Sequence, residues 1–226
     1  MSQDGTHPGR IAARLAQVRD RIERAGGDPG TVTVLAVTKG FGPGAVEAAW
    51  AAGLAEVGEN YAQELLAKRE ALAGRGPDGQ RWHFLGAVQT NKVARLAPHV
   101  DCWQSVSRHL EGERIARTAP GARVLVQVGF ATGAGRPGAE PAAVPGLVEG
   151  LRRLDLDVAG LMAVAPRGVA ARSAFATVRR LADDLGLPVR SMGMTEDLEL
   201  AVAEGSTLVR VGRALFGERP GPEAGG

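Results

Sequence analysis

A lysine at the end of an apolar strand is the residue whose type and place most directly suggest chemistry in this sequence. Lys39 ends the run VTVLAVTK, which we expect to be buried on both faces because nearly every residue in it is apolar. Burial lowers the pKa of a lysine, and the neutral amine is the form that attacks a carbonyl carbon. Arginine is the default cation here, since only Lys39, Lys68 and Lys92 are lysines among 27 basic residues. A strand-end lysine that reaches solvent is the ordinary alternative.

Two glycine-containing turns follow the last two expected strands. SMGMT (191–195) and RVGRALFG (210–217) each end a strand and open a helix. Small residues let backbone N–H groups approach a phosphate, and the start of a helix favours negative charge. Ser191 and Thr195 could add hydroxyl donors, and Arg213 could add a positive charge. Tight turns with no ligand are the ordinary alternative.

Other polar residues fall inside or just after expected strands. Arg210 lies in an otherwise apolar strand, and because arginine stays charged on burial it needs a partner, either a structural carboxylate or a ligand atom. Asn60 falls at a strand-to-helix junction, where an N-cap is the usual role. We interpret His83 as a core histidine and not as a catalyst. Gly86, at a strand end, is typical of a close approach between two backbone segments.

Eight strand–helix units must position these residues, after a leading amphipathic helix over 10–25. Unbroken alternation predicts parallel strands with right-handed crossovers. Eight units favour a single (β/α)8 TIM barrel with an extra N-terminal helix, in which functional side chains lie where the strands end. A doubly wound open sheet is the alternative. We expect strands at 31–38, 54–58, 82–86, 100–106, 122–129, 156–163, 187–193 and 206–212, with helices at 43–52, 60–72, 90–97, 107–117, 140–153, 169–185, 195–204 and 213–217.

Length and composition restrict the class of protein. We expect one domain over residues 1–226, with flexible tails at 1–8 and 219–226, and the 44% hydrophobic content suits an ordinary globular core. The sequence contains neither a long apolar run nor a secretory signal, so we expect a cytoplasmic protein without membrane contact. Cys102 is the only cysteine, which excludes internal disulfides and cysteine-based zinc clusters, and we expect no metal site. A net charge of +2 and 4% aromatic residues argue against nucleic-acid binding.

Several motifs together resemble the pyridoxal phosphate homeostasis protein family, whose members are single-domain barrels related to the N-terminal domain of alanine racemase. The matching stretches are AVTK (36–39), GENYAQE (58–64), WHFLGAVQTNK (82–92), GLMAV (160–164), SMGMTEDLELAVAEGST (191–207) and VRVGRALFG (209–217). They cover nearly the whole chain. The resemblance implies that pyridoxal 5'-phosphate (PLP), the cofactor form of vitamin B6, is bound as a Schiff base on Lys39.

The resemblance also implies the roles of the surrounding residues. Arg210 would face the pyridine nitrogen of PLP, and Asn60 and Met162 would line the ring pocket. An arginine at that nitrogen keeps it unprotonated, which makes PLP a poor electron sink and suits holding the cofactor better than catalysis. The phosphate would be held by Ser191, Gly212 and the surrounding turn residues, namely Gly193, Met194, Thr195 and Arg213.

The sequence departs from the family pattern in five places. Phe41 stands where a second lysine is frequent, and Arg136 replaces a lysine in the segment GAGRPG, so a second PLP site built on lysines loses support. Ala87 replaces a frequent histidine, and Thr195 replaces a serine. Arg213 stands where a threonine is common, and it either adds a cation to the phosphate site or points outward.

Three functions are compatible with these residues. The first is intracellular PLP homeostasis, meaning storage, buffering or delivery to PLP-dependent apo-enzymes, by a non-enzymatic and monomeric protein. The alternative is a PLP-dependent amino-acid racemase, but racemisation needs a second acid–base group, and Tyr61 is the only tyrosine. A Schiff-base aldolase acting on a phosphosugar needs carboxylates nearby, and Glu59 is the only acidic residue at an expected strand end. We therefore favour PLP homeostasis.

Overall fold

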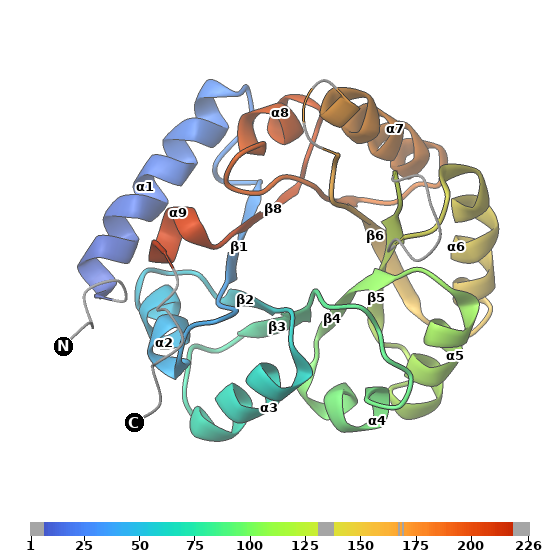
Figure 1. Ribbon diagram of the computed structural model, residues 1–226, viewed down its shortest axis with the longest axis horizontal. Helices are drawn as coiled ribbons and strands as arrows, with labels where there is room; N and C mark the ends of the chain where they lie inside the picture. The colour runs from blue at the N-terminus through green and yellow to red at the C-terminus, as the bar shows by residue number, and fades with distance from the viewer. Residues whose placement is uncertain (1–6, 131–137, 167, 169, 219–226) are drawn as a thin grey trace.

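Eight parallel strands close into a barrel in chain order, and helices surround it (Figure 1). The computed structural model describes residues 7–130, 138–166, 168 and 170–218. The barrel closes because the last strand pairs with the first, with Leu35 opposite Arg210. The predicted TIM barrel is therefore confirmed, and the open-sheet alternative is wrong.

The elements follow the expected order, and the strands are mostly shorter than predicted. The strands are β1 (Thr33–Val37), β2 (Glu56–Glu59), β3 (Arg81–Phe84), β4 (Cys102–Val106), β5 (Arg123–Val128), β6 (Asp157–Ala163), β7 (Val189–Ser191) and β8 (Leu208–Val211). The α-helices are α1 (Pro8–Arg24), α2 (Pro43–Ala51), α3 (Ala62–Ala71), α4 (Val93–Leu96), α5 (His109–Thr118), α6 (Val144–Arg152), α7 (Ala170–Asp184), α8 (Leu198–Ala203) and α9 (Arg213–Phe216). Two short 3-10 helices each contain a proline near their start. η1 (Ala97–His99) follows α4, and η2 (Pro141–Ala143) precedes α6.

The extra N-terminal helix is present and packs on the outside of the barrel. α1 buries its apolar stripe and contacts α2, α8 and α9 (Figure 1). The tails expected at 1–8 and 219–226 lie mostly outside the described residues, which omit 1–6 and 219–226. At the N-terminal end, Pro8 already begins α1. The buried residues of the stripe are Ile11, Leu15, Val18 and Ile22, as their spacing predicts.

The apolar core has two parts. A large cluster, which includes the buried stripe of α1, packs the strands against the helices. A small second cluster, formed by Cys102, Leu125, Ala159 and Met162, comes from β4, β5 and β6.

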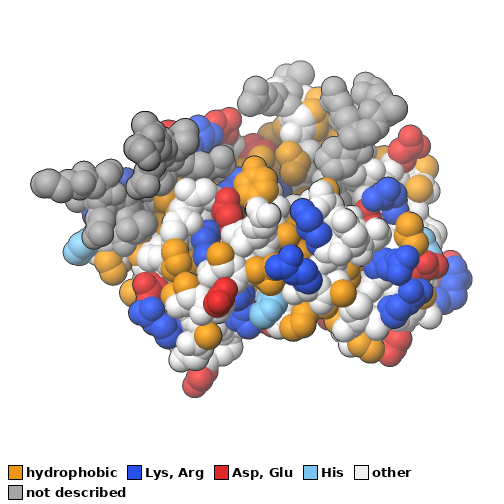
Figure 2. Space-filling view, turned by 60° about the horizontal axis from the view of Figure 1, so that its bottom comes forward, with side chains coloured by type: hydrophobic (Ala, Val, Ile, Leu, Met, Phe, Trp, Pro, Cys, Tyr) orange, Lys and Arg blue, Asp and Glu red, His pale blue; other side chains and the backbone are white. Residues whose placement is uncertain are grey.

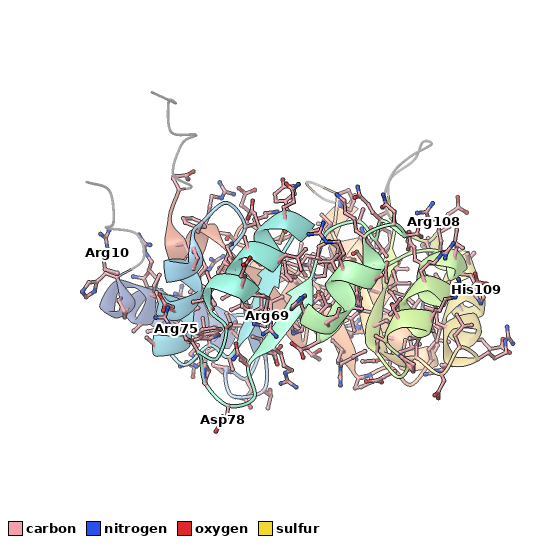
Figure 3. The ribbon with its side chains drawn as sticks, turned by 90° about the horizontal axis from the view of Figure 1, so that it is seen from below. Arg10, Arg69, Arg75, Asp78, Arg108 and His109 are labelled. Atoms are coloured by element: carbon pink, nitrogen blue, oxygen red, sulfur yellow. The ribbon has the colours of Figure 1, made fainter. Side chains whose placement is uncertain are left out.

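Two labelled residues in Figure 3 identify the two ends of the barrel. Asp78, in the loop that leads into β3, marks the end where the strands begin, and Arg108, after β4, marks the end where they finish (Figure 3). Basic side chains on the face shown in Figure 2 are spread among acidic and hydrophobic ones.

Within the described residues, no helix combines the length and apolar character that a membrane crossing needs.

Candidate functional site

Lys39 lies at the end of the barrel where the strands finish. β1 is buried from Val34 onward, Thr38 is fully buried, and Lys39 itself is half-buried. Lys39 thus lies two residues beyond the last residue of β1, with the buried Thr38 between them. A half-buried amine at this position can meet a ligand that enters from solvent while its stem remains packed.

A charged cluster, formed by the buried Glu59 and Lys68 and the partly exposed Glu64, holds the backbone on both sides of Lys39. The Nζ of Lys68 donates to the Thr38 carbonyl oxygen (2.8 Å) and to Glu59 Oε1 (2.5 Å). The Thr38 hydroxyl donates to the same Glu59 oxygen at 2.5 Å. Glu64 accepts the backbone N–H of Gly40 at 2.7 Å. The residues before and after Lys39 are therefore tied to β2 and α3.

The sequence interpretation missed Lys68. Its side chain is only 4% exposed and forms an ion pair with Glu59, which is completely buried. Burial raises the pKa of the Glu59 carboxyl, and the Lys68 charge and its hydrogen bond oppose that shift. The sequence contained a signal for an ion pair of Lys68, because Glu64 and Lys68 are four residues apart and lie on one face of α3.

The turn after β7 is compact and anchored. Gly193 has a φ of +87°, and a Cβ there would lie 2.6 Å from the Cβ of Ala201, so this turn needs glycine. The Gly193 carbonyl accepts the backbone N–H of Arg210 at 3.0 Å. Arg21 of α1 donates to the Thr195 carbonyl oxygen at 2.8 Å. Met194 is exposed, and its N–H donates to Asp197 at 2.6 Å.

Gly212 and Arg213 lie in the turn after β8, beside the turn after β7. Gly212 is half-buried, and its carbonyl accepts the N–H groups of Leu215 and Phe216. The exposed side chain of Arg213 donates to Glu196 at 2.5 Å. In this structure Arg213 thus pairs with a carboxylate of the neighbouring turn.

Arg210 is buried, and among the described residues its hydrogen-bond partners are neutral oxygens. Its Nη1 donates to the carbonyl oxygen (2.6 Å) and the hydroxyl (2.8 Å) of Ser191, and its Nη2 donates to the Ala163 carbonyl at 2.7 Å. Burial lowers the pKa of the guanidinium to about 10, which leaves it charged at neutral pH. Among the described residues no carboxylate forms an ion pair with it, and the charge of Asp197 opposes the lowering of its pKa. The cation is held at the ends of β6 and β7.

Ser191 is hydrogen-bonded directly to Arg210. Its hydroxyl is completely buried, accepts from Arg210 and donates to Gln104 Oε1 at 2.7 Å. The expected contact between this hydroxyl and a phosphate would require that donation to be given up. In the structure, Ser191 therefore orients the guanidinium.

Asn60 and Met162 are placed differently from each other. Met162 is buried in the second apolar cluster, on a strand that ends at the same mouth as Lys39. The usual N-cap role of Asn60 is wrong, because Tyr61 occupies the N-cap of α3 and no side chain caps that helix. Within the described part of the chain, the buried Oδ1 of Asn60 has no hydrogen-bond partner. A buried acceptor without a donor is an unmet demand that a ligand can satisfy.

Gly86 permits the close approach that the sequence indicated. A Cβ at Gly86 would overlap the carbonyl oxygen of Asn60. The Gly86 carbonyl in turn accepts a hydrogen bond from the Ser105 hydroxyl. The segments after β2 and β3 are thereby held against each other.

The remaining departures from the family pattern have clear places. Phe41 packs its ring against Phe216, with 5.4 Å between the centroids, and Ala87 is exposed. Arg136 lies outside the described residues. Position 41 therefore contributes apolar packing between the segment after Lys39 and α9.

Exposed apolar side chains surround the end of the barrel where the strands finish. The described large hydrophobic residues that are exposed all follow a strand, after β2, β4, β6 and β7. They come from four separate segments, and exposed hydrophobic residues that are scattered singly are ordinary on a protein surface. These residues are Tyr61, Leu110, Val164 and Met194.

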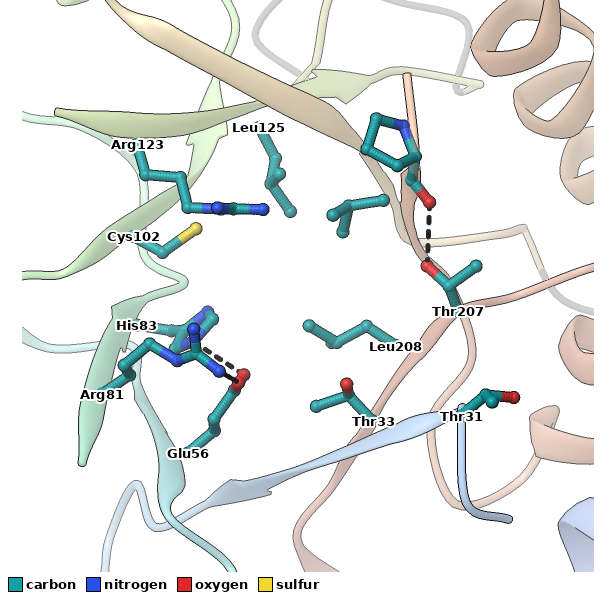
Figure 4. Close-up of a pocket in the computed structure, with 12 residues that line it drawn as sticks. Thr31, Thr33, Glu56, Arg81, His83, Cys102, Arg123, Leu125, Thr207 and Leu208 are labelled. Atoms are coloured by element: carbon teal, nitrogen blue, oxygen red, sulfur yellow. Dashed lines mark hydrogen bonds and ion pairs between the residues drawn. The ribbon is translucent and has the colours of Figure 1, made fainter. Parts of the chain in front are cut away.

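A cavity of about 270 Å³ opens at the opposite end, where the strands begin (Figure 4). Its walls include Glu56, Arg81, His83, Cys102 and Arg123. It contains no lysine, and within the described residues no cluster of His, Cys, Asp and Glu could hold a metal ion. The chemistry expected from Lys39 therefore belongs to the other end.

Comparisons with known proteins agree with this geometry. A family model described as the N-terminal domain of alanine racemase matches residues 7–220. The pyridoxal phosphate homeostasis protein of Pseudomonas aeruginosa is 41% identical over 220 residues, which cover 92% of this chain and 94% of that protein. The protein of that name from Escherichia coli K12 is 36% identical over 228 residues, which cover 92% of this chain and 97% of that protein.

Solved structures show the same relationship. PipY from Synechococcus elongatus, in a structure with PLP bound, has a TM-score of 0.80 and 36% identity and covers 92% of this chain and 100% of its own. Alanine racemase from Corynebacterium glutamicum has a TM-score of 0.72 at 16% identity and covers 96% of this chain and 63% of its own, a likeness of fold alone. From its sequence and its barrel, this chain belongs to the pyridoxal phosphate homeostasis protein family.

Proposed function

We propose that this chain binds PLP as a Schiff base on Lys39 and acts in cytoplasmic PLP homeostasis, by storing, buffering or delivering the cofactor. The observation that carries the proposal is that Lys39 and the buried cation of Arg210 lie at the same end of the barrel. The PLP-bound state of PipY, at 36% identity, supports the same assignment. The Lys39 amine would condense with the aldehyde carbon of PLP and release the carbonyl oxygen as water.

The residues at this end fit the cofactor. The Oδ1 of Asn60 lacks a donor, and an Arg210 N–H can serve an aromatic nitrogen. We expect the turn residues Gly193 and Thr195 and the turn at Gly212 to bind the phosphate through the backbone. PLP supplies an aldehyde and an electron-withdrawing ring, and an arginine at the ring nitrogen weakens that withdrawal.

The chain's own residues support binding without turnover. A racemase needs an acid–base group on each face of its substrate, and the sequence has one tyrosine. Tyr61 is 56% exposed on the rim, at the start of α3. Glu59 is fully buried with Lys68 and is not available as the carboxylate of an aldolase. We therefore assign the chain no catalytic role.

The central test is covalent trapping of the cofactor. Purified protein is expected to be yellow, and borohydride reduction followed by peptide mass spectrometry is expected to place PLP on Lys39. Lys39→Ala should remove the label, whereas Lys92→Ala, at an exposed lysine, should retain it. Reducible covalent PLP on Lys39→Ala protein would disprove the Schiff-base assignment.

Function beyond binding has its own test. The loaded protein, mixed with the apo form of a PLP-dependent aminotransferase, is expected to restore that enzyme's activity, while Lys39→Ala protein restores none. Incubation with L-alanine or D-alanine is expected to give no sustained interconversion. Sustained turnover would replace the homeostasis assignment by the racemase alternative.

A further inference from the structure

A chain of hydrogen bonds continues from Arg210 into the barrel. Arg210 Nη1 donates to Ser191 Oγ at 2.8 Å, and Ser191 Oγ donates to Gln104 Oε1 at 2.7 Å. The Gln104 Nε2 lies 2.8 Å from His83 Nδ1. The other ring nitrogen of His83, Nε2, lies 3.1 Å from Glu56 Oε2. The polar path therefore joins β8, β7, β4, β3 and β2.

The path crosses the barrel instead of following one wall. β4 pairs with β3 and β5, and β7 pairs with β6 and β8, so the Gln104–Ser191 bond joins strands that are not neighbours. Gln104 and Ser191 are completely buried, and His83 is 5% exposed. Water cannot replace a broken link at such positions, and each unmet donor or acceptor would be penalised.

The donors and acceptors of the path allow one consistent direction. An amide Nε2 can only donate, so His83 Nδ1 must accept from Gln104 and its proton must lie on Nε2, toward Glu56. If the Gln104 amide were reversed, Ser191 Oγ would accept from both Gln104 and Arg210. The hydroxyl proton of Ser191 would then have no acceptor among its observed contacts.

We propose that Gln104 and His83 are positioning residues for Arg210, which fix through Ser191 the orientation of the guanidinium toward the cofactor. Gln104 sets the direction of the Ser191 hydroxyl, so the lone pairs of Ser191 Oγ remain aimed at Arg210 Nη1. His83 in turn fixes the orientation of the Gln104 amide. The inference rests on the proposed PLP site. It adds two residues, Gln104 and His83, to which the sequence motifs assign no role in that site.

The far end of the path reaches the cavity where the strands begin. His83 and Glu56 both line that cavity, and Glu56 also pairs with Arg81 at 2.5 Å (Figure 4). Burial raises the pKa of the Glu56 carboxyl, and the neighbouring His83 and Arg81 outweigh it, so the pKa is lowered. His83 Nε2 lies within ion-pair distance of Glu56 Oε2 at 3.1 Å, although the contact lacks hydrogen-bond geometry among the described residues. A negative charge on Glu56 favours a proton on the Nε2 that faces it.

The first test needs no cofactor. Long-range ¹H–¹⁵N NMR spectra of the cofactor-free protein at neutral pH are expected to show His83 with an unprotonated Nδ1 and a protonated Nε2. Loss of these signals in His83→Gln protein identifies them. A proton on Nδ1 would overturn the proposed direction of the path and with it the proposal, whether or not the protein binds PLP.

The second test separates positioning from general support of the fold. Gln104→Met keeps the side-chain length but removes both links, and it is expected to raise the Kd for PLP about threefold to tenfold, as loss of one net hydrogen bond implies. It should also shift the absorption maximum of bound PLP, because the guanidinium near the ring changes orientation. Gln17→Met, at an exposed position of α1, is the matched control and is expected to leave both unchanged.

A conservative variant completes the design. In His83→Gln the new amide can accept from Gln104 and donate to Glu56, so both PLP readouts are expected to stay near wild type, whereas His83→Leu is expected to behave like Gln104→Met. Folded Gln104→Met protein with wild-type Kd and spectrum would overturn the proposal. If wild-type protein bound no PLP, the proposed function would fail instead, and the NMR result would still decide the direction of the path.

Discussion

Lys68 donates a hydrogen bond to the carbonyl oxygen of Thr38, over a distance of 2.8 Å between Nζ and oxygen. That carbonyl belongs to the peptide group that leads into Lys39. The ammonium of one lysine thus holds the backbone from which the other lysine projects, and Glu59 neutralises it. Two lysines of similar chemistry therefore have separate tasks, which their burial distinguishes.

Replacing Lys68 should destabilise the fold strongly. Lys68→Met would leave Glu59 buried without its ion pair, so we expect a loss of about 3–5 kcal/mol in the free energy of unfolding. Urea denaturation followed by circular dichroism measures the loss. Lys92→Met, at an exposed lysine, should change it by less than about 0.5 kcal/mol. Equal stability of the two variants would show that the buried pair does not anchor this end of β1.

Replacing Asn60 should affect ligand binding more than stability. Its buried Oδ1 has no partner, so Asn60→Ala removes an unmet acceptor and should change the free energy of unfolding by less than about 1 kcal/mol. Affinity for PLP should fall at least about threefold, because the ligand loses an acceptor next to its ring. Thermal unfolding and fluorescence titration measure the two effects. A large stability loss with unchanged affinity would assign Asn60 to the fold alone.

Gly86 should not tolerate a methyl group. In Gly86→Ala the new Cβ would overlap the Asn60 carbonyl, so the segments after β2 and β3 must separate, at a cost of about 1–3 kcal/mol. Gly146→Ala on α6 is the control, since a Cβ there meets nothing within 4 Å and alanine favours a helix. Urea denaturation of both variants checks the contrast. Unchanged stability of Gly86→Ala would mean that the close approach is not required.

Much of the fold could be predicted because its signals are local. The alternation of apolar strands and helices gives the barrel, and the barrel places Lys39, Asn60 and the glycine turns at one end. Element boundaries depend on single residues: the helix expected over 90–97 is α4 followed by η1 in the structure, since Pro98 lacks the N–H that continues an α-helix.

The contacts inside the barrel could not be predicted from local patterns. The Gln104–Ser191 bond joins residues 87 positions apart, and it occupies the Ser191 hydroxyl proton. Asn60 failed as an N-cap because its carbonyl packs against Gly86 and α3 begins after Tyr61. In both cases the decisive partner comes from another strand, which spacing in the sequence does not reveal.

Cys102 should be unreactive while the protein is folded. Burial raises the pKa of its thiol to about 12, so at pH 8 the thiolate is about 1,000-fold rarer than in the unfolded chain. Reaction with a disulfide reagent should therefore be slow in buffer and fast in guanidinium chloride. Rapid labelling of folded protein would contradict the burial of this residue.

The same shift predicts a dependence of stability on pH. Between pH 9, the ordinary pKa of the thiol, and about 12, the folded state keeps a proton that the unfolded chain loses. The contribution of Cys102 to stability should therefore fall as pH rises through this window. Denaturation of wild-type and Cys102→Val protein at pH 8 and pH 10 isolates this contribution. A constant difference between the two proteins would contradict it.

The pairing of β8 with β1 has a consequence for biosynthesis. Lys39 leaves the ribosome early, but the guanidinium of Arg210 and the strand that carries it are made near the end of translation. A nascent or truncated chain that stops before β8 has the nucleophile without the rest of its pocket. If PLP binds as proposed, such a chain should retain the cofactor poorly, so loading should follow the synthesis of β8.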